Sequence, residues 1–108
     1  MRFLVRGQFV EVGALLPPPS AAEFLDNAII PSLEILARLE AEGTIHGGVL
    51  IGQREGVFVM EADSAEQASE VLIGLPFWVL LKWDVTPLQT FASAVERERR
   101  VRAQLPAD

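Results

Sequence analysis

The sequence contains no cysteine, a single histidine and a single lysine among its 108 residues. Without cysteine the chain forms no disulfide, no thiolate metal site and no cysteine nucleophile. One histidine excludes a histidine-rich metal site within one chain. No apolar run approaches the roughly 20 residues that a membrane-spanning helix needs. The chain is therefore predicted to lack a metal site and a transmembrane segment.

Basic residues are also scarce, because 9 Lys and Arg stand against 15 Asp and Glu, for a net charge of −6. They are scattered except near the C-terminus, so no basic face is available for nucleic acid. The N-terminus resembles a strand and lacks the long apolar region and cleavage site of a signal peptide. We expect a soluble cytoplasmic protein that binds neither nucleic acid nor membranes.

What is abundant is apolar surface, since half of the residues are hydrophobic and 22% are charged. This composition and length predict one globular domain over residues 1–90, followed by a C-terminal helical extension over residues 91–108. A domain of this size builds only a small core, so association would stabilise it.

The stretch Gly74–Leu88 is predicted to organise the fold as its last strand, between the breaks at Gly74–Pro76 and Pro87. Alternation separates its side chains into two faces. We expect the apolar set to face the helices and Trp78, Lys82 and Asp84 to face a partner's sheet. The apolar set consists of Phe77, Val79, Leu81, Trp83 and Val85.

Alternating apolar residues predict three earlier strands, over Arg2–Val12, Thr44–Gly52 and Val57–Ala62. The last two are joined by a hairpin loop, Gln53–Gly56. Leu15–Pro19 is predicted to be an extended connector.

Two helices follow from capping boxes that begin at Ser20 and Ser64. The first helix should extend to about Glu42, bend near Asn27–Pro31 and end at Gly43. A further helix is predicted from Thr90, with an apolar stripe so thin that it should lie along a partner.

This order predicts an α+β fold, a ferredoxin-like βαββαβ antiparallel sheet with both helices on one face and a C-terminal helix. The first strand should pair with the third and the last. The uncovered face is too apolar for solvent, which predicts a homodimer or higher homo-oligomer with sheets face to face. It is predicted to carry Leu4, Leu50, Val57, Val59, Trp78 and Leu80.

Short motifs add a family resemblance. Leu39–Thr44 at the helix exit, and Leu75–Trp78 followed by Trp83–Leu88 in the last strand, resemble the muconolactone isomerase-like proteins of the dimeric α/β-barrel superfamily. The resemblance implies a ferredoxin-like dimeric barrel over about residues 1–90. It also implies isomerisation by proton transfer without metal or cofactor, in a pocket between sheet and helices.

The positions that match the family's pocket differ in character. The first helix carries Ile29–Leu33 where the family is charged, and only Glu34 matches as an acid. The second strand reads Ile45–Val49 where the family has aromatic and basic residues. We expect a more apolar pocket that takes a small hydrophobic molecule.

Three residues are candidates for proton transfer. His46, as the one histidine, is a candidate proton carrier, but it also fits a hydrogen-bonded role at a dimer interface or loop end. Glu34 could act as a base at the pocket mouth or lie on a solvated helix face. Lys82 could have a depressed pKa in a dry barrel, or form an ion pair with Asp84 or Glu61. Alternation places Lys82 opposite the pocket.

Aromatic residues are candidates for the pocket wall, with Gly7, Gly47 and Gly48 leaving space beside them. Phe77, Trp83, Phe9 and Phe58 are the predicted ligand-binding residues. Arg6 could hold an anionic ligand, or join Gln8, Glu61, Lys82 and Asp84 in a polar network that fixes dimer register; we favour the network.

Three functions remain open. The first is a cofactor-independent isomerase or binding protein for a hydrophobic carbonyl or lactone. The second is a non-enzymatic assembly or accessory subunit that acts through its dimer and C-terminal helix. The third is a cofactor-independent monooxygenase with an aromatic pocket.

Overall fold

The computed structural model describes residues 1–9 and 18–107. In this part of the chain, four antiparallel strands form one sheet in the order β2–β3–β1–β4. The strands are β1 (Arg2–Phe9), β2 (Ile45–Val49), β3 (Glu55–Glu61) and β4 (Leu81–Leu88). β1 pairs with β3 and β4, as predicted.

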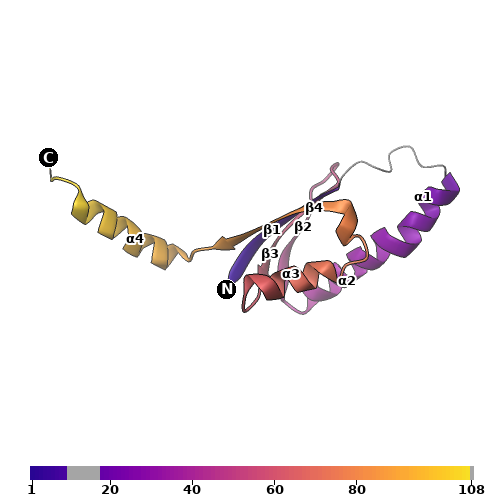
Figure 1. Cartoon of the computed structure of the whole chain (residues 1–108), viewed down its shortest axis with the longest axis horizontal. Coiled ribbons are helices and arrows are strands. Elements are labelled where there is room, and N and C mark those ends of the chain that lie inside the picture. Colours follow the sequence, from indigo (N-terminus) through magenta and orange to yellow (C-terminus); the bar gives the residue numbers. More distant parts are fainter. Residues whose placement is uncertain (10–17, 108) are drawn as a thin grey trace.

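Helices cover one face of this sheet (Figure 1). They are α1 (Pro18–Phe24), the π-helical turn η1 (Leu25–Ile29), α2 (Ile30–Ala41) and α3 (Ala65–Ile73). A 3₁₀ turn, η2 (Trp78–Leu80), precedes β4, and α4 (Phe91–Gln104) follows it. The predicted ferredoxin-like βαββαβ order with a C-terminal helix is confirmed.

The core lies where the helices meet the covered face. Strict register brings Phe3 opposite Met60 and Val5 opposite Phe58, and all four side chains are buried. α3 adds Ala68 and Leu72. Buried apolar side chains on neighbouring strands and on a helix form one contiguous cluster, which holds the layers together.

At the ends of the helices, two of the predicted capping signals are present in the structure and one is not. Ser64 caps α3 by accepting a 3.1 Å hydrogen bond from the Gln67 amide, as its capping box predicts. Gly43, at φ +81°, ends α2, and the Thr44 amide reaches back to the Leu39 carbonyl at 2.9 Å. The capping box at Ser20 is wrong, because α1 already begins at Pro18.

The first helix is irregular where Pro31 predicts a bend. Pro31 lacks a backbone donor, and the residues Leu25–Ile29, just before the start of α2, adopt the π-helical turn η1. Pro18 and Pro19 open α1 instead of belonging to an extended connector, since proline is well tolerated in a first helical turn. The remainder of that connector, 15–17, and the predicted strand residues 10–12 lie outside the described residues.

The predicted last strand begins four residues too early. Phe77, Trp78 and Val79 belong to the approach to β4 and to η2, where Trp78 donates to the Leu75 carbonyl at 2.9 Å. The backbone amides of Trp78 and Leu80 donate hydrogen bonds within this turn, so they are not available to pair with a neighbouring strand. Val79 is consequently 76% exposed and does not face the helices. β4 continues through Pro87, which an edge strand tolerates.

The two middle strands also have different bounds from those predicted. The β2–β3 connection occupies residues 50–54, and β3 begins at Glu55, inside the predicted hairpin loop. Leu50 therefore lies in a turn, and Trp78 and Leu80 lie in η2, so these three side chains are not on the uncovered sheet face. Leu4, Val57 and Val59 are on that face, as predicted.

Candidate functional site

A cavity of about 380 Å³ lies between the sheet and the helical layer formed by α1, η1 and α2. Gly7, Phe58, Leu81 and Trp83 line it from the strands. Apolar side chains line it from the helices, namely Ala21, Phe24, Leu25, Ile29, Leu33 and Leu36. The cavity is thus bounded by the same two layers that build the core.

A close approach at Gly7 makes room for the indole of Trp83. A Cβ atom built on Gly7 would lie 2.6 Å from Trp83 Cζ3 and 2.9 Å from Leu81 Cδ2. The indole therefore occupies the space that any side chain at position 7 would need. Its Nε1–H donates to the Trp78 carbonyl at 3.0 Å, which satisfies its one polar group and fixes the ring.

Phe77 is held beside Trp83 by a contact from α2. Its backbone N–H donates to the hydroxyl of Ser32 at 3.0 Å, and that hydroxyl donates to the Ala28 carbonyl at 2.7 Å. The Phe77 and Trp83 ring centroids lie 6.2 Å apart at an interplanar angle of 57°. One buried serine thus connects the helical layer to the aromatic wall of the cavity.

A second aromatic contact closes the other side of the cavity. Phe9 and Phe24 meet edge to face, with centroids 6.0 Å apart. The guanidinium of Arg54 lies 5.9 Å from the Phe9 centroid, within cation–π range. The end of β1 and the end of α1 are therefore joined here by the contact between Phe9 and Phe24.

The cavity opens where its lining residues are exposed. Leu25 is 46% exposed, Leu33 40% and Val49 57%. Gln53 and Arg54, both exposed, bring hydrogen-bond donors to the same region. The interior of the cavity is apolar, and its exposed lining combines these three apolar side chains with the polar groups of Gln53 and Arg54.

The predicted ligand-binding residues separate into two places. Phe9, Phe58, Phe77 and Trp83 all line the cavity. Arg6 points from the opposite face of the sheet, where its Nη2 lies 2.6 Å from Glu55 Oε1. The hydrogen bond to Glu55, together with the carboxylate charge, raises the pKa of Arg6 above its usual value.

The three predicted proton carriers do not gather at the cavity. His46 stands opposite Val59, and Lys82 stands opposite Gln8, so both lie on the uncovered face. Glu34 is exposed on α2. Within the described residues, none of the three belongs to the cavity lining.

The predicted polar network on the uncovered face exists only in separate pairs. Arg2 bonds to Glu61 at 2.8 Å, Arg6 bonds to Glu55, and Thr86 donates to Asp84 at 3.1 Å. The hydrogen bond from Arg2 lowers the pKa of Glu61, with smaller help from the charges of the N-terminus and His46. These pairs surround the apolar side chains of Leu4, Val57 and Val59.

Ser32 and Arg54 are among the contributors to the site that were not predicted. Ser32 sat in the sequence as one polar residue within an apolar helical stripe, which is the signal that could have identified it. Arg54 lies in a hairpin loop, where sequence periodicity carries no information about direction.

Other site types find no support in the part of the chain that the structure describes. Across residues 1–9 and 18–107, no three His, Asp or Glu side chains gather as metal ligands would. No helix in these ranges is both long enough and apolar enough to cross a membrane.

Comparison with known proteins bears on the fold. No protein-family model matches the chain, and no curated protein matches it. A crystal structure of muconolactone isomerase at 3.3 Å resolution aligns with a TM-score of 0.64 and 24% sequence identity. The alignment covers 83% of this chain and 90% of the other. The chain therefore has the fold of muconolactone isomerase, as the sequence motifs predicted.

Proposed function

We propose that the protein binds a small, hydrophobic, carbonyl-bearing molecule in the cavity between the sheet and α1, η1 and α2. The cavity itself carries this proposal. Its volume of about 380 Å³ falls in the range of about 300–1,000 Å³ typical of small-molecule sites. Aromatic and aliphatic walls with a few polar groups are also the usual composition of such sites.

The polar side of the cavity suggests how the ligand is oriented. The apolar body would lie against Phe77 and Trp83, which the Ser32 contact holds in place. A carbonyl oxygen would accept hydrogen bonds from Gln53 or Arg54 on the open side, because both side chains carry N–H donors. This orientation leaves most of the buried surface to apolar contact.

The test is a substitution that should fill the cavity without changing the fold. Ala21 lines the cavity, whereas its neighbour Ala22 is exposed and is not among the lining residues. Ala21→Trp should weaken binding of the fluorescent apolar probe N-phenyl-1-naphthylamine by about tenfold or more, as the loss of about 1.4 kcal/mol of contact would. Ala22→Trp should leave binding unchanged. Equal binding by both variants would refute the site.

Isomerase activity is the second candidate, favoured by the fold shared with muconolactone isomerase. Proton transfer would then fall to His46, Glu34 or Lys82, reaching the ligand from outside the lining of one chain. Lactone turnover should fall at least about 100-fold in one of His46→Ala, Glu34→Gln and Lys82→Met if that residue is the general base or acid. Turnover that survives all three substitutions would reject this assignment.

We also infer that a second copy of the chain covers the uncovered sheet face. Leu4, Val57 and Val59 form an apolar row between strands, with the Arg2–Glu61 and Arg6–Glu55 pairs at its border. An apolar centre with a polar border is the usual anatomy of a protein interface. Val59→Glu should convert the homo-oligomer to a monomer in light scattering; Glu66→Gln on α3 is the control.

A further inference from the structure

We propose that the ligand carries an unbranched alkyl chain, which lies in a groove between α2 and the edge strand β2, beside the cavity. The inference rests on the proposed binding of a hydrophobic carbonyl compound and specifies its class, a ring with a carbonyl group and an alkyl tail. The groove is a separate space of about 180 Å³. Its use by a ligand is therefore testable apart from the use of the cavity.

The groove follows one face of α2. Its lining residues on this helix are spaced i, i+3, i+4 and i+7, which places them on one side of the helix. They are Leu33, Leu36, Ala37 and Glu40. Leu33 is 40% exposed and Ala37 is also exposed, so this face of α2 is not part of the packed core. At about 1.5 Å per residue the face is about 10 Å long, a shape that suits a chain better than a ring.

A glycine on β2 leaves the opposite wall of the groove without a side chain. Gly47 shares its sheet face with buried Ile45, which places it toward the helices, and it stands opposite Phe58. Only glycine fits at this position, because a Cβ atom would overlap the Val57 carbonyl and lie 2.5 Å from Phe58 Cα. The groove is therefore built into the sheet, and no side chain at position 47 fills it.

The groove adjoins the cavity along a shared wall. The residues that line both spaces come from α2 and from the two neighbouring strands. They are Leu33, Leu36, Val49, Gly56 and Phe58. A substituent on a ring in the cavity enters the groove by passing these residues, so one ligand occupies both spaces.

The size and polarity of the groove favour an alkyl chain. An apolar cavity of about 150 Å³ holds a six-carbon molecule such as benzene, so about 180 Å³ accommodates about six carbons. Among residues 1–9 and 18–107, Glu40 is the one charged residue that lines the groove, at the end of the α2 face away from Leu33. A carboxylate there disfavours an acidic tail, because like charges repel. An uncharged alkyl chain satisfies both conditions.

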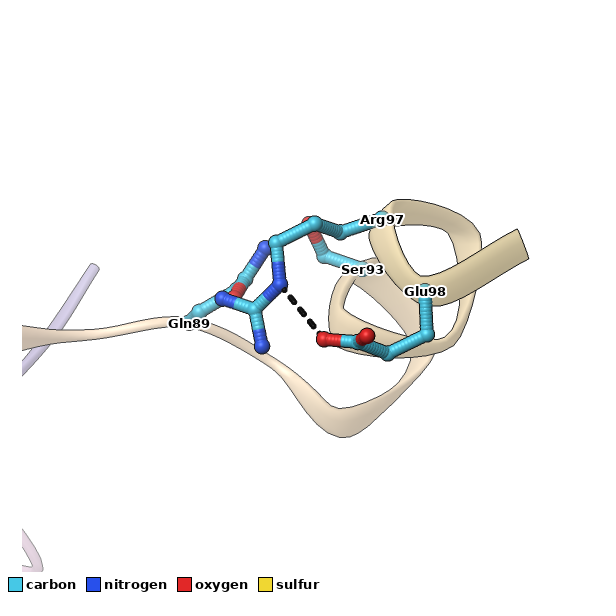
Figure 2. A network of polar contacts seen from close by, with 4 residues as sticks. All are labelled: Gln89, Ser93, Arg97 and Glu98. Carbon is cyan, nitrogen blue, oxygen red and sulfur yellow. Dashed lines mark hydrogen bonds and ion pairs between the residues drawn. The ribbon is translucent and has the colours of Figure 1, made fainter. Parts of the chain in front are cut away.

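Within the described residues, the C-terminal helix of the same chain does not cover the groove. β2 and β4 are opposite edges of the sheet, and α4 follows β4. α4 extends away from α2 (Figure 1). Figure 2 shows Gln89 beside Ser93 and Arg97, where it donates to Ser93 at 3.0 Å and accepts from Arg97 at 2.8 Å. These bonds fix the start of α4 at the end of β4, on the edge of the sheet opposite the groove.

A series of alkyl phenyl ketones tests the inference, because its members differ only in chain length. Ketones from acetophenone to decanophenone compete with N-phenyl-1-naphthylamine for the full-length protein, which gives each dissociation constant. Affinity should rise about twofold to fourfold with each methylene that enters the groove and should level off after about six carbons. An affinity that does not depend on chain length would overturn the proposal.

Longer chains bind most apolar surfaces more tightly, so a variant must show that the groove is responsible. Ala37→Trp fills the groove from an exposed position, and Ala37 does not line the cavity. This variant should weaken octanophenone binding at least about tenfold and leave acetophenone binding unchanged. Ala22→Trp, exposed and outside both linings, should change neither. The wild-type dependence on chain length in Ala37→Trp would refute the use of the groove.

Protection of a thiol locates the tail without a bulky side chain. Ala37→Cys introduces the only thiol, because the chain has no native cysteine. Octanophenone at about ten times its dissociation constant should slow alkylation by iodoacetamide about tenfold, as the free sites are depleted. Acetophenone should not slow it, and Ala22→Cys is the control. Equal rates with and without octanophenone would overturn the proposal. So would a thiol already protected without ketone, since another part of the protein would then cover the groove.

These measurements separate the inference from the proposed function. If Ala21→Trp weakens acetophenone binding but affinity does not depend on chain length, the cavity binds its ligand and the tail inference alone falls. If Ala21→Trp leaves acetophenone binding intact while Ala37→Trp removes the dependence on chain length, the groove binds the alkyl chain and the proposed cavity site falls.

Discussion

The Ser32 hydroxyl accepts a 3.0 Å hydrogen bond from the backbone N–H of Phe77, 45 positions away in sequence. The same hydroxyl donates to the Ala28 carbonyl at 2.7 Å, within the π-helical turn η1. Ser32 is fully buried, so both bonds form away from water. This single side chain joins the irregular first helix to the segment that leads into β4 and to the aromatic wall of the cavity.

Ser32→Ala should destabilise the protein by about 1–3 kcal/mol, because it leaves the buried Phe77 N–H without an acceptor. Urea unfolding followed by far-ultraviolet circular dichroism measures the change. Ser69→Ala on the exposed side of α3 is the matched control and should shift stability by less than about 0.5 kcal/mol. Equal midpoints for the two variants would show that the Ser32 bond contributes nothing net.

The fold followed from the sequence because its signals were redundant. Alternation in β1 and β3, the cap at Ser64 and the glycine stop at Gly43 each pointed to the same order of elements. Strand pairing then had few alternatives, since crossovers of this kind restrict topology. Where one signal stood alone, as at Ser20, the neighbouring prolines overrode it and the helix started earlier.

The site could be predicted from the sequence less completely than the fold, because it depends on distances between residues that are far apart in the chain. The alternation that placed Trp83 toward the helices held, since β4 does pair with β1 in register through Gly7. Phe77 reached the cavity for a different reason, through its bond to Ser32 and not through strand alternation. No periodicity in the sequence links positions 32 and 77, whereas strand alternation had already placed Lys82 on the sheet face opposite the pocket.

The close contact between Gly7 and Trp83 predicts that alanine is tolerated less well at position 7 than at position 48. Gly7→Ala places a methyl group 2.6 Å from the indole, so the ring must move or the strands must separate. We expect a loss of about 1–3 kcal/mol in stability, typical of overpacking, and weaker binding of N-phenyl-1-naphthylamine. Gly48→Ala is the control, because among the described residues no heavy atom beyond Gly48 and its two chain neighbours lies within 4 Å of the added methyl group. Unchanged probe binding in Gly7→Ala would mean that Trp83 does not shape the site.

The two capping boxes of the sequence predict opposite results for the same substitution. Ser64→Ala removes the acceptor for the Gln67 amide and should cost about 1 kcal/mol of stability. Ser20→Ala falls inside α1, where alanine is the better helix former, and should be neutral or slightly stabilising. Thermal unfolding of both variants measures the difference. A larger loss at Ser20 than at Ser64 would contradict the observed start of α1.

The Arg2–Glu61 pair predicts a stability difference that disappears in acid. The hydrogen bond from Arg2 lowers the pKa of Glu61, so the folded carboxylate holds its charge to lower pH than the unfolded one does. Its contribution is therefore present above the unfolded pKa of about 4.3 and is lost as pH falls through the lowered folded value. Arg2→Met should lower the thermal midpoint slightly at about pH 7, and the two midpoints should converge near about pH 3.

The control for that experiment is Arg38→Met, which removes a positive charge from α2 where no ion pair with Arg38 exists among the described residues. The difference in thermal midpoint between Arg38→Met and the wild type should not depend on the ionisation of Glu61.

The Arg2–Glu61 pair is exposed on both sides, with 69% of the Arg2 and 53% of the Glu61 side chain accessible, so its contribution to stability is small in solution. A second copy over the uncovered face would shield the Arg2–Glu61 pair from water and so increase the contribution of the pair to stability. A pH-dependent difference that grows with protein concentration would therefore place Arg2 and Glu61 at the border of the interface, whereas a difference independent of concentration would place them outside it.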